Sequence, residues 1–201
     1  MAVDVYLMRH GETEGNVDQV LMGRGDSPFT AAGWQQPVEV ARQLGSQPLA
    51  CIYTSPMART QRTAKLVLEA LGRPIAIQME MAIAEIDAGD FTGLTFGEIR
   101  AHVSDDAILG EFRYPGGESW ADVQRRAVDF VLQLEGRHAG ESVLLVTHAG
   151  VIAGLVAVYV GEPIERFIRT RFGHDYLGRL TIAEGAFVSY ERIVGTVDSW
   201  L

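Results

Sequence analysis

Short apolar runs alternate along the chain with stretches in which apolar residues recur at helical spacing. This pattern predicts strands that alternate with helices. The strand candidates are Val3 to Met8, Cys51 to Thr54, Ile75 to Gln78 and Val143 to Thr147. We therefore predict an α/β fold of three layers, α/β/α, with a mostly parallel central sheet.

Start and stop signals delimit the helices between these strands. The predicted helices run from Thr30 to Leu44, from Ser55 to Leu71, from Ser119 to Leu134 and from about Val151 onward. Ser55 followed by Pro56 is typical of an N-cap and a first helical position. The string from Ser119 to Asp122 resembles a capping box, with Asp where Glu is commoner.

The apolar stretch from Val143 to Val160 is about as long as the ~20 residues that a membrane span needs. It contains His148 and two glycines, Gly150 and Gly154, and it lacks a basic flank. We interpret it as a buried strand followed by a buried helix, and we expect no membrane association.

Residues 86–118 differ from the rest because they are rich in glycine and lack a long periodic pattern. We predict mainly loops and a short helix there, packed as a cap over one end of the sheet. In open α/β sheets, ligands bind beyond the carboxyl ends of the strands. The whole chain, residues 1–201, is predicted to be a single domain with this cap as an insertion at about 86–118.

Amino-acid composition argues against some classes of partner and cellular location. The 201 residues include 17 Lys and Arg against 26 Asp and Glu, a net charge of −9. Such a balance argues against a nucleic-acid partner, whose binding needs a basic footprint. A single cysteine, Cys51, excludes an internal disulfide, and the N-terminus is unlike a signal peptide. The expected location is the cytoplasm.

Four basic side chains lie where predicted strands end. Arg9 and His10 follow the first strand, Arg59 lies in the first turn of the helix after the second, and His148 follows the fourth. Because the carboxyl ends of parallel strands meet at one edge, we expect these side chains to surround one small anion. Arginine suits a phosphate because its planar fork donates two charge-assisted hydrogen bonds.

Six strings around these positions carry a family resemblance, in the family's order. They are Leu7 to Asn16, Asp26 to Gly33, Tyr53 to Ala64, Ala84 to Gly93, Pro115 to Ser119 and Val146 to Gly150. The chain thus resembles the histidine phosphatase superfamily, with its phosphoglycerate-mutase-like fold. Its length and its Gly-Gly-Glu-Ser block are similar to the phosphatase branch that holds α-ribazole phosphatases and broad-specificity phosphatases.

The resemblance implies a role for each matching residue. His10 would be the nucleophile that takes the phosphoryl group, and Glu85 would donate a proton to the leaving oxygen. Oxygens of the phosphoryl group would be bound by Arg9, Arg59 and His148, with substrate contacts from Asn16, Gly23 and Ala149. For Gly117, Glu118 and Ser119 a structural role is expected more than a catalytic one. The implied chemistry uses no cofactor and no metal ion.

The chemistry also sets the protonation states that we expect. His10 must attack as a neutral imidazole, with a backbone carbonyl near Gly11 fixing its tautomer and neighbouring cations lowering its pKa. His148 is expected to be protonated so that it stabilises the charge on the phosphoryl group. Bound phosphate is expected to raise the pKa of Glu85, as a like charge does.

Three functions remain open at this point: hydrolysis of a small-molecule phosphate ester, phosphoglycerate-mutase-type transfer, and phosphate recognition without catalysis. Residues 86–120 hold two arginines, Arg100 and Arg113, against seven acids, and a mutase needs extra basic residues there. The acids are Asp87, Asp90, Glu98, Asp105, Asp106, Glu111 and Glu118. Hydrolysis is therefore favoured, with a substrate of low negative charge beyond its phosphate.

Aromatic residues in the cap and directly after it either line a substrate pocket or pack in the core, and we expect core packing for at least three of them. They are Phe91, Phe96, Phe112, Tyr114 and Trp120. The oligomeric state is open as well. The apolar end from Val197 to Leu201 either docks on its own core or meets a partner, a homodimer being one alternative.

Overall fold

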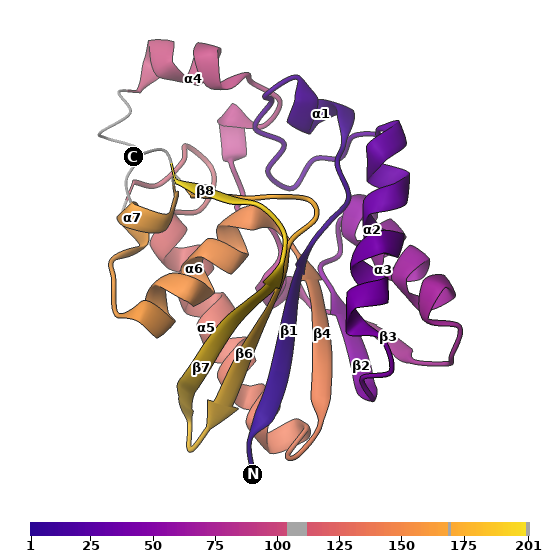
Figure 1. Cartoon of the computed structure of the whole chain (residues 1–201). Coiled ribbons are helices and arrows are strands. Elements are labelled where there is room, and N and C mark those ends of the chain that lie inside the picture. The colour runs from indigo at the N-terminus through magenta and orange to yellow at the C-terminus, as the bar shows by residue number, and fades with distance from the viewer. Residues whose placement is uncertain (104–111, 169, 200–201) are drawn as a thin grey trace.

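The computed structural model describes residues 1–103, 112–168 and 170–199. A six-stranded sheet of order β3-β2-β4-β1-β6-β7 forms its centre, and β5 and β8 form a second sheet of two strands (Figure 1). The strands are β1 (Val3–Arg9), β2 (Leu49–Thr54), β3 (Ala76–Met79), β4 (Ser142–Thr147), β5 (Thr170–Phe172), β6 (Leu177–Ala183), β7 (Ala186–Val194) and β8 (Val197–Ser199).

The four strands predicted from the sequence form the parallel part of the central sheet. β1 pairs with β4, β4 with β2 and β2 with β3, all in parallel. The predicted ranges differ from the observed ones by one or two residues at their ends. Since all four strands run upward in Figure 1, their carboxyl ends meet at the upper edge of the sheet. The α/β prediction with a mostly parallel sheet is therefore confirmed.

The C-terminal third adds antiparallel strands that the sequence pattern did not predict. β6 pairs with the other side of β1, and β7 pairs with β6 through a tight turn at Glu184 and Gly185, both with positive φ. Val197 to Ser199 form β8, which pairs with β5, so this part of the C-terminal end docks on its own chain. Trp200 and Leu201 lie outside the described residues.

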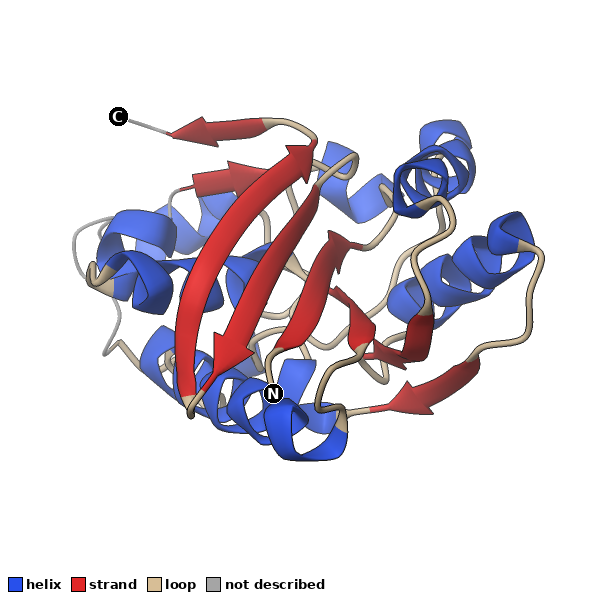
Figure 2. Ribbon diagram, turned by 60° about the horizontal axis from the view of Figure 1, so that its bottom comes forward, coloured by secondary structure: helices blue, strands red, loops and turns tan. Residues whose placement is uncertain are grey.

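Helices cover both faces of the sheet (Figure 2). They are α1 (Glu14–Val17), α2 (Ala31–Leu44), α3 (Ala58–Leu71), α4 (Phe96–His102), α5 (Trp120–Arg137), α6 (Ala149–Val160) and α7 (Ile164–Ile168), with short 3-10 turns η1 (Met81–Ile83) and η2 (Gly89–Phe91). Tyr6 and Met8 of β1 pack toward α2 and α3, whereas Val5 and Leu7 pack toward α5 and α6. The alternation of side chains along β1 thus joins two cores.

Two helices begin elsewhere than predicted. Ser55 is not the cap of α3, which begins at Ala58 after Met57. The Ser55 amide still donates to Val146 of β4, and its hydroxyl is held within the site described below, so neither is free to cap a helix. α6 begins at Ala149 rather than near Val151. The predicted start of α2 at Thr30 and the predicted capping box at Ser119 before α5 are confirmed.

The stretch from Val143 to Val160 is β4 followed by α6, and most of its side chains are buried inside the protein. Within the part of the chain that the structure describes, no helix combines the length and the apolar character that crossing a membrane requires.

The predicted cap lies over the upper end of the sheet and contains η2 and α4, joined by loops. Its acids Asp105, Asp106 and Glu111 lie outside the described residues. Phe91 and Tyr114 are buried in the core, as expected for some of the cap aromatics, whereas Phe96 is 46% exposed.

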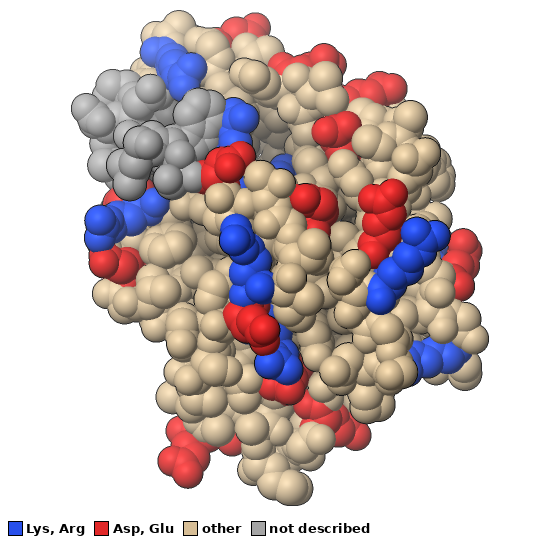
Figure 3. All heavy atoms as spheres, in the orientation of Figure 1, with Lys and Arg blue, Asp and Glu red and all other residues tan. Residues whose placement is uncertain are grey.

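Charges of both signs are mixed over the face of the molecule shown in Figure 3. Across the central sheet, for example, Arg179 of β6 lies 2.7 Å from a carboxylate oxygen of Glu191 on β7. Asp4 of β1, which lies diagonally across from Arg179 in the pairing of β1 with β6, is 4.0 Å from the same guanidinium.

The Ser119 cap generates a stability prediction. Its hydroxyl accepts a hydrogen bond from the Asp122 amide at 3.2 Å and donates to the Asp122 carboxylate at 2.8 Å. Replacing Ser119 with Ala removes both bonds, so we expect the free energy of unfolding to fall by ~1 kcal/mol. Urea denaturation measures it, with Ser189→Ala on the exposed face of β7 as control. Equal midpoints for S119A and wild type would contradict this view of the helix start.

Candidate active site

His10 lies at the carboxyl end of β1 and is 3% exposed. Its amide donates to the Thr147 carbonyl of β4, which anchors the residue to the neighbouring strand. Ring atom Nδ1 is 2.8 Å from the Gly11 carbonyl oxygen, which accepts its proton, so the lone pair is on Nε2. Burial, then the positive charge of Arg59, lowers the His10 pKa well below its usual value. A neutral imidazole with Nε2 free is the state expected of the predicted nucleophile.

His148 faces His10 across the site, with 5.2 Å between the ring centroids. It is the residue before α6 and is fully buried. Its Nε2 lies 2.7 Å from the Ser55 hydroxyl, and its Nδ1 is 3.3 Å from Nη2 of Arg59. Because a guanidinium can only donate, Nδ1 carries the lone pair and Nε2 carries the proton.

His148 therefore differs from the expectation of a protonated imidazole. Burial, followed by the charges of Arg59 and Arg9, lowers its pKa well below the usual value, which makes the ring neutral at neutral pH. The sequence places a histidine at the strand end, but it does not show that two arginines and complete burial will surround it.

The guanidinium of Arg59 joins the site to the loop after α1. The side chain is buried, with Nη1 donating to the Gly25 carbonyl at 2.5 Å and Nη2 donating to the Gly23 carbonyl at 2.7 Å. The nearest carboxylate oxygen of Asp26 is 3.9 Å away. Arg59 thus fixes the loop that closes one side of the site.

Arg9, the residue before the predicted nucleophile, is bound by a backbone carbonyl from the C-terminal part of the chain. Its Nη1 donates to the Phe172 carbonyl at 2.6 Å. Its Nε is buried and has no hydrogen-bond partner in the described structure. An unpaired buried donor on a permanent cation is suited to an anion, because leaving such a group unpaired is costly.

Glu85 brings a carboxylate to the same place from the segment after η1. Its side chain is 16% exposed, and its Oε2 lies 4.0 Å from Nδ1 of His148. Its Oε1 accepts from the amide of Ile86 at 3.0 Å. The Trp120 ring lies against Gly150, where an added Cβ would be 2.0 Å from the ring and 2.9 Å from Oε1 of Glu85. This wall helps to keep water from the carboxyl.

Burial raises the pKa of Glu85, and the charge of Arg59 opposes the rise. The direction agrees with the prediction, but the cause differs: desolvation already favours the protonated acid without a phosphate nearby.

Three predicted substrate contacts are placed less decisively. The Asn16 amide oxygen accepts from the amide and the hydroxyl of Thr13, so this end of the side chain holds the local turn. The Gly23 carbonyl is used by Arg59, and Ala149 is the first residue of α6, where backbone N–H groups lack helical partners. Their contacts to substrate stay predictions.

Glu118 and Arg126 form a clamp around the Glu85 segment. Arg126 donates to the Glu85 carbonyl at 3.2 Å, and Glu118 accepts from the Asp87 amide at 3.0 Å. The two side chains are joined at 3.0 Å, so the backbone directly after the Glu85 side chain is held at two points. This gives Glu118 the structural role expected for its block. Arg126 was missed, because an arginine within a helix gives no sequence signal of such contacts.

His174, which follows β5, is a second residue that the sequence analysis missed. Its ring centroid is 5.3 Å from that of His10, and its Nδ1 is 2.7 Å from the His10 carbonyl oxygen. No motif surrounds it, and its proximity depends on the unpredicted C-terminal strands. In the residues that the structure describes, no group of three or more His, Cys, Asp or Glu side chains is arranged to hold a metal ion.

The comparisons with known proteins agree with this geometry. Residues 5–192 match the model of the histidine phosphatase superfamily, branch 1. The chain belongs to this superfamily of enzymes, which includes phosphatases and mutases.

Individual relatives carry different names. "Probable phosphoglycerate mutase GpmB" of Yersinia enterocolitica is 32% identical over 93% of this chain and 88% of its own length. The structure of Bacillus stearothermophilus YhfR is 34% identical, with a TM-score of 0.81 over 92% of this chain and 94% of its own. A mycobacterial glucosyl-3-phosphoglycerate phosphatase in complex with VO3 is 25% identical, with a TM-score of 0.81 over 95% and 97% of the two chains.

The raised pKa of Glu85 predicts how stability depends on pH. An unfolded Glu titrates at about 4.3. Since the folded carboxyl binds its proton more tightly, the wild type loses stability as the pH rises from about 4 through the raised pKa. Glu85→Gln keeps an acceptor for the Ile86 amide but cannot ionise. We expect the free energy of unfolding of E85Q to exceed that of wild type by more at pH 8 than at pH 5, as measured by urea denaturation.

Glu98 is a matched control of opposite sign. It is exposed, and hydrogen bonds from Thr95 lower its pKa. Its contribution to stability is present above the unfolded pKa and lost as the pH falls below it. The free energy of unfolding of E98Q relative to wild type should therefore be lower at pH 5 than at pH 3 and nearly the same at pH 5 and pH 8. A margin for E85Q that stays flat or shrinks with pH would show that burial does not disfavour the ionised carboxyl.

Proposed function

We propose that the protein is a metal-independent phosphomonoesterase that hydrolyses a small-molecule phosphate ester through a phosphohistidine at His10. One observation carries the proposal. The unprotonated Nε2 of a buried, neutral His10 belongs to the same site as two arginines and a half-buried carboxyl whose pKa is raised by desolvation. This arrangement supplies a nucleophile, fixed positive charge and an acid.

In the first step, Nε2 of His10 attacks phosphorus, and the bond from phosphorus to the ester oxygen breaks. Arg9 and Arg59 stabilise the charge on the transferring phosphoryl oxygens. The leaving alkoxide takes the proton of Glu85, so an alcohol departs and the carboxyl becomes a carboxylate. As the dianion binds beside His148, its charge raises the pKa of that ring and favours uptake of a proton there.

In the second step, water attacks phosphorus and gives a proton to the Glu85 carboxylate. The bond from phosphorus to Nε2 breaks, which releases orthophosphate and restores both groups. Covalent catalysis thus replaces one difficult displacement by two easier ones.

Ion pairs beside the Glu85 segment and in the cap support hydrolysis of an ester with an uncharged leaving group. Arg24 is 3.2 Å from Asp87 and 3.0 Å from Glu118. Arg113 lies 2.6 Å from Asp122. These arginines are already neutralised by carboxylates, so a second acidic group on the substrate would meet little positive charge from them.

The name of the Yersinia relative favours a second candidate, transfer between phosphoglycerate positions. A mutase must hold another anionic group of its substrate while the intermediate reorients. Isomerisation of 3-phosphoglycerate with little release of free phosphate would establish that activity in place of hydrolysis.

Trapping the intermediate tests the nucleophile. Rapid quench of the wild type with a radiolabelled phosphomonoester should give a phosphoenzyme that is lost in acid and survives base. His10→Ala should lose this label and at least ~1000-fold of kcat, because no other group takes over the attack.

His102→Ala is the control for that measurement, since this exposed histidine lies in α4 of the cap. It should keep the label and a kcat within about twofold of wild type. Full turnover by H10A would remove His10 from the nucleophile role, and binding of vanadate without turnover of any ester would favour a recognition module.

A substrate panel tests the charge argument. We expect kcat/KM for α-ribazole 5′-phosphate, sugar phosphates or phosphoserine to exceed that for 3-phosphoglycerate by at least ~10-fold. Asp87→Asn removes one partner of Arg24 and should reduce this ratio by about two- to fivefold, the range of a partly exposed ion pair. Asp90→Asn makes the same charge change at an exposed neighbour and should leave the ratio unaltered. Equal ratios in D87N and D90N would exclude Arg24 pairing as a source of selectivity.

A further inference from the structure

We propose that His174 is a positioning residue for the nucleophile, because its imidazole fixes the peptide group between His10 and Gly11 and thereby the direction of the His10 ring. This inference rests on the proposed nucleophilic role of His10. It adds to the site a residue from the far end of the chain that touches the nucleophile through its backbone.

The contact between the two histidines has a defined chemistry. Nδ1 of His174 lies 2.7 Å from the carbonyl oxygen of His10, and a carbonyl can only accept, so Nδ1 carries the proton. The two rings meet edge to face, with their planes 60° apart. His148 meets His10 with the same angle between the ring planes, so the His10 ring contacts two other histidine rings.

The bond to His174 closes a short chain of hydrogen bonds around one peptide group. The carbonyl of His10 accepts from His174, and the N–H of the same peptide, on Gly11, donates to the hydroxyl of Thr63 at 3.0 Å. With both of its polar groups held, this peptide cannot rotate without losing a bond. The next carbonyl, on Gly11, is the acceptor for Nδ1 of His10.

Packing prevents the backbone from yielding in another direction. An added Cβ on Gly11 would lie 2.3 Å from the carbonyl oxygen of Gly33 in α2, so the two backbones are in close contact. The orientation of the Gly11 carbonyl, and with it the direction of Nε2 on His10, therefore depends on the hydrogen bonds that this peptide accepts from His174 and donates to Thr63.

The segment 172–174 is itself well anchored, so it can act as a fixed support. The Gly173 amide donates to the Thr196 carbonyl at 2.7 Å, next to the pairing of β5 with β8. The same segment accepts from Arg9 through the Phe172 carbonyl. Burial, and then the charge of Arg9, lowers the pKa of His174 to about 3, so the ring stays neutral and keeps the proton on Nδ1 as its donor.

Three substitutions separate the hydrogen bond from the bulk of the ring. His174→Phe keeps an aromatic ring without the donor, and His174→Asn places an N–H donor at the same number of bonds from Cβ as Nδ1. His174→Gln moves the donor one bond further out. The readouts are kcat and KM for p-nitrophenyl phosphate, together with the single-turnover rate of phosphoenzyme formation.

We expect H174F and H174Q to lose about 10- to 100-fold in kcat and in phosphoenzyme formation, with KM within about threefold of wild type. H174N should recover to within about threefold of wild type. A residue that matters only for stability would not give rescue by Asn together with a selective loss of kcat.

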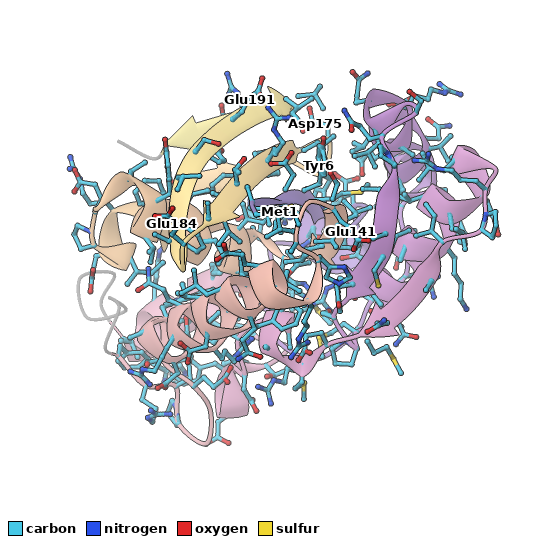
Figure 4. All side chains as sticks on the ribbon, turned by 90° about the horizontal axis from the view of Figure 1, so that it is seen from below. Met1, Tyr6, Glu141, Asp175, Glu184 and Glu191 are labelled. Atoms are coloured by element: carbon cyan, nitrogen blue, oxygen red, sulfur yellow. The ribbon has the colours of Figure 1, made fainter. Side chains whose placement is uncertain are left out.

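The matched control is His138→Phe. His138, like His174, is half-buried, and it bonds the Tyr53 hydroxyl and the Glu141 carboxylate. It lies at the lower end of the sheet, opposite the site. Figure 4 views the protein from this end, with Met1 and Glu141 labelled. H138F should keep kcat within about twofold, whatever it does to the unfolding midpoint.

The outcomes are distinguishable. A kcat within threefold of wild type in H174F and H174Q overturns the inference, and so does an H174N that folds with the wild-type midpoint but is as slow as H174Q. If H174F does not fold, the comparison of H174N with H174Q decides. Absence of a base-stable phosphoenzyme in the wild type would instead overturn the proposed function itself.

Discussion

The hydrogen bond from Nδ1 of His10 to the Gly11 carbonyl decides which ring nitrogen carries the lone pair. Without this bond both tautomers of a neutral imidazole would be populated, and part of the protein would present an N–H where the nucleophile that we propose needs a lone pair. The bond in turn requires a backbone that does not move. The pairing of β1 with β4 and the close packing of Gly11 on α2 hold this backbone in place. The tautomer of His10 at the edge of the sheet therefore depends on the strand pairing at its centre.

Burial is the second determinant, because the same desolvation acts in opposite directions on bases and acids. It lowers the pKa of His10, His148 and His174 and raises that of Glu85. Even Arg9, with a pKa lowered to about 10, stays charged at neutral pH. The site thus holds neutral imidazoles and a carboxyl group whose pKa is raised, beside arginines that stay charged at neutral pH.

The parallel half of the fold and the residues at its strand ends could be predicted from sequence, because buried strands are apolar and their ends carry recognisable strings. What could not be predicted depends on tertiary contact. β7 is an edge strand whose positions are mostly exposed, and the buried residues of β6 alternate with half-buried polar ones such as Arg179 and Thr181, so the apolar runs are weak. The neutral state of His148 follows from complete burial beside two arginines, and the contacts of Arg126 and His174 join segments far apart in sequence.

The support of the nucleophile by the segment after β5 has a consequence for synthesis of the protein. The bonds from Arg9 to Phe172 and from His174 to His10 each span more than 160 positions along the chain. During synthesis His10 is made early, whereas His174, which bonds its carbonyl, is made near the end. Because neither bond can form before the segment after β5 has been made, a nascent or truncated polypeptide contains His10 and Arg9 without the contacts that hold them. The hydrolysis that we propose therefore requires the chain through this segment.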